Sequence, residues 1–406
     1  MAQPRLSASP RPVEKKHEVD EHRLASADGQ ETPGAGTGAL IVNPDRIRHF
    51  GPTDGAAFCL VTNPGLVEKF AFGAARKYSS AKIVALPDDR PLHALFGAEI
   101  PESSHVLVIS PEKFLTSPEA QSLGRRKLIV MPCASTPCGR DAIAHFLAVV
   151  ERSDPEREAA FVDRFFKLGE ASDRLEFVDD EYGTRAVLKH LDESYEWNVQ
   201  AALLDWGDQQ IAPSGEISVV PGSIMEFDPS LALALDGEIA LKGALAVHCG
   251  AVSYYEPDRS RLFESLSTIR EHAVVVRVRE GRIAEVRATH RLSEPAAEAL
   301  TALIEIDSRY ATIWECGFGI NAEHVLFGGN CGMNESYGGP SGCCHWGLGL
   351  TPFTQYALII LCPQTRALGK DGAHLAGPAL RGTGASETAA VGMGRVKKGP
   401  CGCYPS

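Results

Sequence analysis

Short apolar runs alternate with amphipathic stretches in the first part of the chain, from Ala57 to about Val150. Each run is five or six residues long and is bounded by Pro, Ser or Asn, which is typical of a buried strand. Between these runs, Leu66–Lys77 and Asp141–Arg152 space their apolar residues as helices do. Alternating strands and helices indicate a mostly parallel sheet with helices on its faces. The predicted strands are Ala57–Thr62, Lys82–Leu86, His105–Ile109 and Lys127–Met131.

The pattern becomes strand-rich from about Ala202 onward. Glu216–Val220 alternates, and Glu238–Tyr255 is a long strand-like stretch. Two further strands, Ala273–Arg279 and Arg282–Thr289, are predicted to form a hairpin around the turn signal Glu280-Gly281.

Three further helices are predicted outside the parallel sheet. Glu156–Glu170 and Gly183–Gln200 precede the strand-rich part, and the second is expected to bridge two domains. Glu294–Ser308 follows the hairpin, with Ser293 as its expected N-cap and Pro295 in its first turn. Its Ala, Leu and Ile residues recur at helical spacing.

These patterns predict an α/β protein. Its N-terminal domain, residues 39–200, has a mostly parallel sheet flanked by helices, and its C-terminal domain, residues 201–376, is a strand-rich α+β domain. Both ends of the chain lack a periodic apolar face. Residues 1–38 are therefore expected to be a disordered tail, and residues 377–406 a flexible tail that contains Gly and Cys.

Charge and composition exclude several partners. The chain has 406 residues and a net charge of -12, which argues against a nucleic-acid binder because phosphate contacts need a concentrated Lys/Arg surface. The longest apolar runs, such as Tyr356–Cys362, are far too short to span a bilayer, so no membrane partner is expected. The first residues lack the apolar core of a secretory signal, and the eleven cysteines form no disulfide framework. The cytoplasm is the expected compartment.

Residues that can hold a metal ion concentrate between Trp314 and Leu350. Ten glycines lie in this segment and allow close approaches of the backbone around a small site. Two His and several Glu can supply ligands for zinc, manganese or iron, although a lone His is more often a hydrogen-bonded structural residue. The cysteines do not form two spaced Cys-x-x-Cys pairs, which argues against a structural zinc ribbon. Cys343 and Cys344 are adjacent and cannot easily share one tetrahedral ion. The candidate residues are Glu315, Cys316, Glu323, His324, Cys331, Glu335, Cys343, Cys344 and His345.

Four motifs follow one another in the second half of the chain. They are Pro213-Ser-Gly-Glu-Ile-Ser-Val-Val-Pro221, Trp314-Glu-Cys-Gly-Phe-Gly-Ile-Asn321, Glu323-His-Val-Leu-Phe-Gly-Gly-Asn330 and Tyr337-Gly-Gly-Pro-Ser-Gly-Cys-Cys-His-Trp-Gly347. In this order they resemble the segments PxGEvftaP, aElgiGtN, gtvHialG.N and yGG…s..HwD of the thermophilic M29 metallo-aminopeptidases. The same fold family includes the 2,5-dihydroxypyridine dioxygenases, which use mononuclear non-haem iron. The resemblance implies a C-terminal domain of the M29 aminopeptidase type.

Carried over position by position, the resemblance also implies a site. It implies metal ligands at Glu216, Glu315, His324 and His345, and contacts with a bound ligand at Cys331 and Tyr337.

The chain departs from the family's pattern in three places. Gly347 stands where the family has an Asp two residues after the second His, and Cys331 stands where the aminopeptidases have a Tyr. The segment between Glu315 and His324 is shorter than in the family and lacks its Glu-Lys pair and catalytic carboxylate. A two-metal hydrolase needs a bridging carboxylate and a base, so the family's aminopeptidase activity is not expected.

Three hypotheses of function remain. The first is a binding or auxiliary protein that has lost catalysis and binds a peptide or small aromatic ligand without metal. The second is a mononuclear metal oxygenase acting on an aromatic or peptide-derived substrate, in which Glu315, Cys331 or Cys344 replaces the missing ligand. The third is a metallohydrolase with rearranged ligands, namely Glu216, Glu315 and either Glu323 or Glu335. One divalent ion, iron or zinc, is the cofactor of both enzyme hypotheses. The resemblance further implies a homodimer.

Overall fold

The structure is a computed structural model. It describes residues 38–111, 115, 118–131, 139–210, 215–222, 228, 230–249, 256–321, 342–350 and 353–379. Apart from residues 38 and 377–379, the two predicted tails lie outside the described residues.

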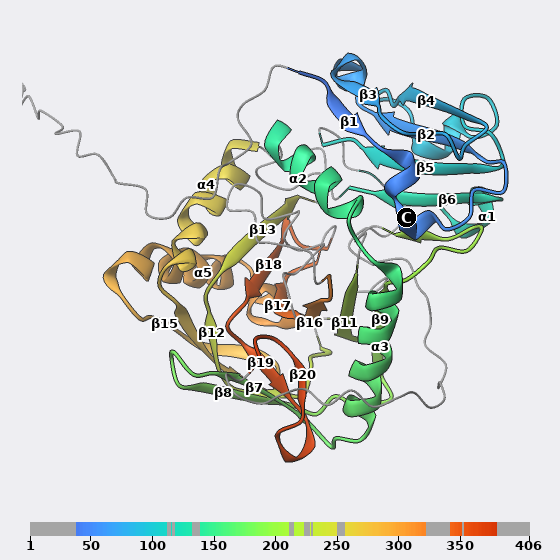
Figure 1. Ribbon diagram of the computed structural model, residues 1–406. Coiled ribbons are helices and arrows are strands. Elements are labelled where there is room, and N and C mark those ends of the chain that lie inside the picture. The colour runs from blue at the N-terminus through green and yellow to red at the C-terminus, as the bar shows by residue number, and fades with distance from the viewer. Residues whose placement is uncertain are drawn as a thin grey trace, which may run out of the picture. The chain divides into compact units, whose positions relative to one another are not determined.

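The predicted parallel sheet is confirmed in the first part of the chain (Figure 1). Its strand order is β10-β6-β5-β2-β4, and every neighbouring pair is parallel. The strands are β2 (Ala57–Thr62), β4 (Ser80–Ala85), β5 (Ser104–Ile109), β6 (Arg126–Val130) and β10 (Gln209–Gln210).

Both faces of this sheet are covered, which explains why its central strands are apolar at consecutive positions. Phe58 and Leu60 of β2 pack in a cluster with α2 (Arg140–Val150), as the spacing of Asp141–Arg152 predicted. Cys59 and Val61 point to the other face and pack in a second cluster beneath the 3₁₀ helix Leu92–Leu95.

The helix predicted over Leu66–Lys77 is wrong. A 3₁₀ helix covers Pro64–Lys69, and Phe70–Phe72 forms strand β3, which pairs in parallel with β1 (Leu40–Val42). Phe70 and Phe72 stand two residues apart, and two-residue spacing fits a strand rather than a helix.

Two antiparallel sheets form the second half of the structure. The six-stranded sheet has the order β13-β18-β17-β16-β11-β9, and the seven-stranded sheet has the order β15-β14-β12-β8-β7-β19-β20. The first contains β9 (Tyr195–Gln200), β11 (Glu216–Pro221), β13 (Ala244–Cys249), β16 (Ile313–Gly319), β17 (Cys343–Leu348) and β18 (Tyr356–Cys362). The second contains β7 (Leu175–Asp179), β8 (Thr184–Leu188), β12 (Leu235–Leu241), β14 (Val274–Arg279), β15 (Arg282–Ala288), β19 (Arg366–Leu368) and β20 (His374–Ala376).

The helix predicted over Gly183–Gln200 is also wrong, because this segment forms β8 and β9. In β9, Tyr195, Trp197 and Val199 alternate with polar residues, and this period of two indicates a strand. These strands pair with β12 and β11, which come later in the chain. The domain boundary at residue 200 stays a prediction, but the strands just before it belong to the sheets of the second half.

The stretch predicted as one long strand, Glu238–Tyr255, contains a turn. β12 ends at Leu241 and β13 begins at Ala244, and residues 250–255 lie outside the described residues. Gly243 makes the turn possible, since its φ is +147° and a Cβ there would collide with the Leu361 carbonyl oxygen.

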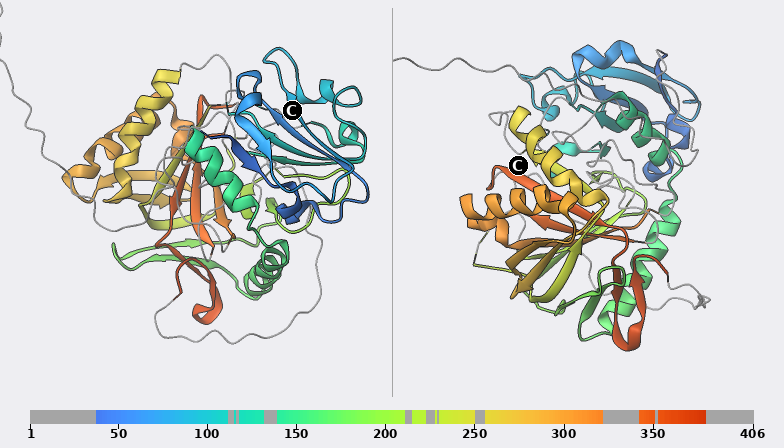
Figure 2. Two further views of the ribbon diagram at one scale, coloured as in Figure 1. Left: turned by 45° about the horizontal axis from the view of Figure 1, so that its top comes forward. Right: turned by 90° about the vertical axis from the view of Figure 1, so that its left-hand side faces the viewer.

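The hairpin of β14 and β15 is confirmed, and Glu280 and Gly281 adopt positive φ angles of 49° and 72° in its turn. Helix α5 (Glu294–Ile306) follows as predicted and packs beside α4 (Glu256–Leu266) (Figure 2). Ser293 occupies the N-cap position, but its hydroxyl donates to the carbonyl oxygens of Ala273 and His290 instead of accepting from the helix.

Helix α3 (Pro155–Glu170) confirms the prediction for Glu156–Glu170, and the side chain of Asp154 caps its N-terminus. No helix within the described part of the chain has both the length and the apolar character needed to cross a membrane.

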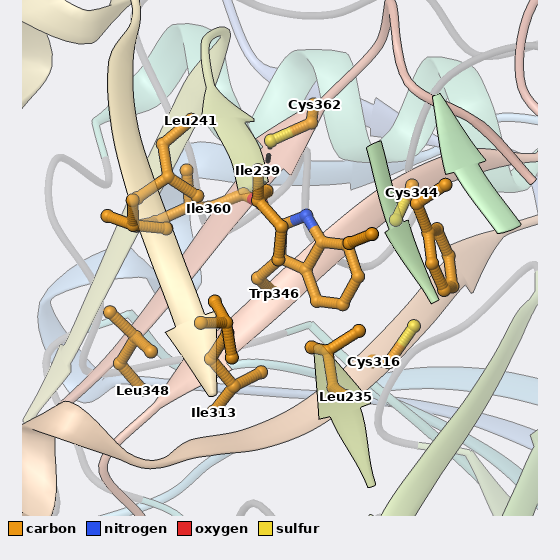
Figure 3. Close-up of a cluster of buried hydrophobic side chains, with 14 of the residues drawn as sticks. Leu235, Ile239, Leu241, Ile313, Cys316, Cys344, Trp346, Leu348, Ile360 and Cys362 are labelled. Carbon is orange, nitrogen blue, oxygen red and sulfur yellow. Dashed lines mark hydrogen bonds between the residues drawn. The ribbon is translucent and has the colours of Figure 1, made fainter. Parts of the chain in front are cut away.

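The largest apolar core joins side chains of both antiparallel sheets. Figure 3 shows Trp346 of β17 at the centre of a buried group, next to Leu235 and Ile239 of β12. Side chains alternate along a strand, so the residues between these core positions point to the opposite face of the six-stranded sheet.

Candidate metal site

The face of the six-stranded sheet that points away from the main core carries buried polar side chains. In β11, Ile217 and Val219 pack in the core, whereas Glu216 and Ser218 alternate with them and are only 4% and 3% exposed. The same alternation in β17 places Cys344 and Trp346 in the core and His345 on the opposite face.

Three of the predicted metal ligands meet on this face. Glu216, Glu315 and His345 each offer a ligand atom, and these atoms all lie within 4.8 Å of one another. All three residues are buried, and His345 is fully shielded from solvent. The Nε2 atom of His345 lies 3.2 Å from Oε1 of Glu216. Residues from three neighbouring strands, β11, β16 and β17, therefore converge on one point.

Two glycines make room for these side chains. Gly317 is the cross-strand partner of His345, and a Cβ at residue 317 would collide with the His345 ring nitrogen. Gly347 is the partner of Glu315, and a Cβ there would lie 2.8 Å from the Glu315 Cβ and 3.0 Å from its Oε2. The imidazole and the carboxylate therefore lie over positions that have no side chain.

The charges of the three groups favour a cation. Two carboxylates buried this close together are costly unless a positive charge compensates them. A protonated His345 supplies one such charge, while a divalent ion bound to neutral His345 would balance both carboxylates.

The donor set also fits a metal ion. One imidazole and two carboxylates are ligands that zinc, iron and manganese accept. The three ligand atoms lie within 4.8 Å of one another, and those of His345 and Glu216 are 3.2 Å apart. By the chemistry of their donor atoms and their convergence, the residues present therefore fit one divalent ion.

Five of the predicted site residues cannot be placed. His324, Cys331 and Tyr337 lie outside the described residues, as do Glu323 and Glu335. Their predicted roles stay predictions.

Cys344 cannot act as a ligand beside His345. The two residues are consecutive in a strand, and Cys344 packs in the core on the opposite face. Burial also raises the pKa of its thiol well above the ordinary value, whereas a metal needs the thiolate. Cys316 of β16 packs in the same core as Cys344 and therefore also points away from the face that carries His345.

A second group of buried polar residues holds the strand ends next to the site. His49 Nε2 lies 2.8 Å from Glu158 Oε2. Glu158 also lies next to Gly215, the residue before Glu216, because a Cβ built on Gly215 would be 3.5 Å from the Glu158 carboxyl carbon. Asn321, just after β16, donates from Nδ2 to Ser153 Oγ at 2.6 Å. These contacts connect the strands that carry Glu216 and Glu315 to the region around α3.

Sequence analysis missed two residues of this face, Asn198 and Ser218. They are cross-strand partners in β9 and β11, and both are buried. The alternation of Glu196, Asn198 and Gln200 with Trp197 and Val199 was the available signal. It was missed because the segment was interpreted as a helix.

Comparisons with known proteins give only distant likenesses. No family model matches the chain, and no curated protein matches it either. The structure of 2,5-dihydroxypyridine dioxygenase from Pseudomonas putida KT2440 is similar with a TM-score of 0.49 and 14% identity, over 83% of this chain and 97% of that one. Wild-type AmpT from Thermus thermophilus gives a TM-score of 0.40 and 14% identity, over 81% and 94% of the two chains. At these values the likeness assigns neither a family nor an activity to this chain.

Proposed function

We propose that the protein is a metalloenzyme that binds one divalent ion through Glu216, Glu315 and His345 and acts on a peptide or small aromatic ligand. The observation that carries the proposal is the convergence of these three buried side chains, with ligand atoms within 4.8 Å of one another. Two adjacent buried carboxylates without a compensating cation would destabilise the folded protein.

The chain's own residues would hold the ion and restrict access of water. Gly317 and Gly347 leave space for the His345 ring and the Glu315 carboxylate, and the surrounding sheet keeps all three ligand residues buried. A bound divalent ion would act as a Lewis acid on an oxygen atom of the ligand. Three protein ligands leave coordination positions for that oxygen, as in other catalytic metal sites.

Metal content tests the proposal. The full chain is purified without chelator, and zinc, iron and manganese are measured per chain in the wild type and in His345→Ala. We expect about one ion per chain in the wild type and a large loss in the variant.

His190→Ala is the matched control. His190 is also buried, but its Nε2 lies 2.9 Å from the Gly169 carbonyl oxygen, away from the candidate site. This variant should keep its metal even if its stability falls. Equal metal content in wild type and His345→Ala would contradict the proposal.

The reaction class needs a separate assay. Oxygen consumption by the iron-loaded protein with a phenolic substrate would support an oxygenase, and release of an amino acid from a peptide by the zinc-loaded protein would support a hydrolase. Both activities should disappear in Glu315→Gln, because both hypotheses use the same ion.

A binding protein without metal is the second candidate. The His345–Glu216 separation of 3.2 Å is also that of an ion pair, so a protonated His345 could compensate Glu216 on its own. A wild-type protein that is folded and free of metal, and that binds a peptide, would favour this candidate. The cytoplasmic location and the homodimer stay predictions under both proposals.

A further inference from the structure

Asn198 of β9 is a buried side chain on the same face as the candidate metal site. It is 5% exposed, and its neighbour Trp197 packs against the main core, so Asn198 points to the opposite face. Within the described part of the chain, its Nδ2 has no hydrogen-bond partner.

The pairing of the strands relates Asn198 to the site. Asn198 pairs with Ser218, Ser218 pairs with Gly317, and Gly317 pairs with His345, so the four residues form one row across β9, β11, β16 and β17. The His345 ring lies over Gly317, which brings it toward β11. Asn198 and Gly317 are separated by two strand spacings, about 10 Å. A ligand bound at the metal and extending over Ser218 would therefore reach Asn198.

A buried amide donor without a partner is unfavourable in a folded protein. Burying an unpaired polar group costs about 1–3 kcal/mol, and most buried donors in proteins have a partner. An unpaired buried donor therefore needs an explanation, and a ligand that supplies the missing acceptor is one. An N–H donor selects an oxygen that can accept, such as a carbonyl or carboxylate oxygen.

We propose that Asn198 is a positioning residue whose Nδ2 donates to a carbonyl or carboxylate oxygen of the ligand bound at the metal. This inference rests on the proposed metal site and adds a second point of attachment. A ligand held at both points has a fixed direction along the row from His345 to Asn198.

Binding of glutaric acid monohydroxamate to the zinc-loaded full chain tests the inference. The two hydroxamate oxygens of this probe bind zinc, and the carboxylate at its other end supplies the acceptor for Asn198. In calorimetric titrations we expect Asn198→Leu to bind it roughly tenfold more weakly than the wild type. Asn198→Asp should bind it more weakly still, because an acceptor replaces the donor. Zinc content should stay at the wild-type level in both variants.

Two controls separate positioning from a structural role. Gln210→Leu removes another buried amide with an unpartnered atom, in the parallel sheet, and should leave the affinity for glutaric acid monohydroxamate unchanged. The melting temperature of Asn198→Leu should equal or exceed that of the wild type, since no hydrogen bond within the described part of the chain is lost. A marked loss of stability in Asn198→Leu would indicate a structural role and overturn the inference.

The remaining outcomes distinguish this inference from the proposed function. Equal affinity of zinc-loaded wild type and Asn198→Leu for glutaric acid monohydroxamate would overturn the inference alone. A zinc-loaded wild type that does not bind this probe would do the same. A wild type that binds no zinc, iron or manganese would overturn the proposed function and the inference together.

Discussion

Glu315 and Gly347 face each other across β16 and β17, and this pairing explains why residue 347 is a Gly. In the M29 family, which the sequence resembles, an Asp stands at this position. In the structure, a Cβ at residue 347 would press on the Glu315 side chain at 2.8 Å. Gly347 therefore provides the space in which the Glu315 carboxylate approaches His345.

Restoring the family's Asp should therefore not restore a family site. We expect Gly347→Asp to displace Glu315, to weaken zinc binding about tenfold or more, and to cost about 1–3 kcal/mol through overpacking. The double variant Glu315→Ala with Gly347→Asp should recover part of the affinity, because the new carboxylate then enters the vacated space. Competition with a chromogenic chelator measures the zinc affinity of the single and the double variant. Tighter zinc binding by Gly347→Asp alone would refute this explanation.

The buried His105 should make stability depend on pH. Burial, followed by the charge of Lys127, lowers the pKa of His105 to about 3, and its ring stacks on Phe50 at 4.7 Å. In the unfolded state the pKa of a His is about 6.5, so between pH 6.5 and about 3 the unfolded chain binds the proton and the folded protein does not. The free energy of unfolding therefore falls as the pH falls through this range.

Urea unfolding at pH 7.5 and 5.5 measures this effect. From pH 7.5 to pH 5.5, the free energy of unfolding should fall by about 1.4 kcal/mol less in His105→Gln than in the wild type. The variant lacks a His that stays neutral in the folded state and takes up a proton on unfolding. Other buried histidines are present in both proteins and cancel. An identical loss in both proteins would show that His105 does not titrate as expected.

At the scale of elements, the N-terminus of α3 depends on Asp154. Its carboxylate accepts from the backbone N–H groups of Glu156 and Arg157 at 3.0 and 3.3 Å and lies 3.0 Å from Arg48 Nη1. We expect Asp154→Ala to cost about 1 kcal/mol of folding stability. Asp154→Asn keeps the capping acceptor and should cost clearly less, since the exposed ion pair contributes little. If urea unfolding shows the same loss of stability in Asp154→Ala and Asp154→Asn, the charge of Asp154 stabilises the protein and the capping hydrogen bonds do not.

The elements that sequence predicted best are those with one strong period. The buried strands from Ala57 to Val130, helix α5 and the hairpin at Glu280-Gly281 were all found, because their patterns and turn residues agree. β9 was missed although its apolar and polar residues alternate, because this short segment was included in the longer helix predicted over Gly183–Gln200.

Glu315 and His345 were already candidates from the concentration of possible ligands between Trp314 and Leu350, whereas Glu216 came from the resemblance alone. Glu216 lies 99 residues before Glu315, and only the pairing of β11, β16 and β17 brings the three residues together. The role of Gly317 could not be predicted, because it depends on the register of β16 against β17. Asn198 could not be linked to the site for the same reason.

At the scale of the whole molecule, metal binding and folding should be coupled. The three candidate ligands come from separate strands, so the site exists only in the folded sheet and a bound ion stabilises that state. Removing metal with a chelator should lower the melting temperature by several degrees, and adding zinc should restore it. Glu216→Gln should show a much smaller response. An unchanged melting temperature after complete metal removal would contradict this coupling.

The most direct measurement is anomalous diffraction from a crystal of the zinc-loaded protein. The account predicts one strong peak at the zinc edge, within about 2.0–2.2 Å of His345 Nε2 and of one oxygen each from Glu216 and Glu315. A zinc-containing crystal with no peak between these side chains, and with His345 paired directly to Glu216, would contradict it.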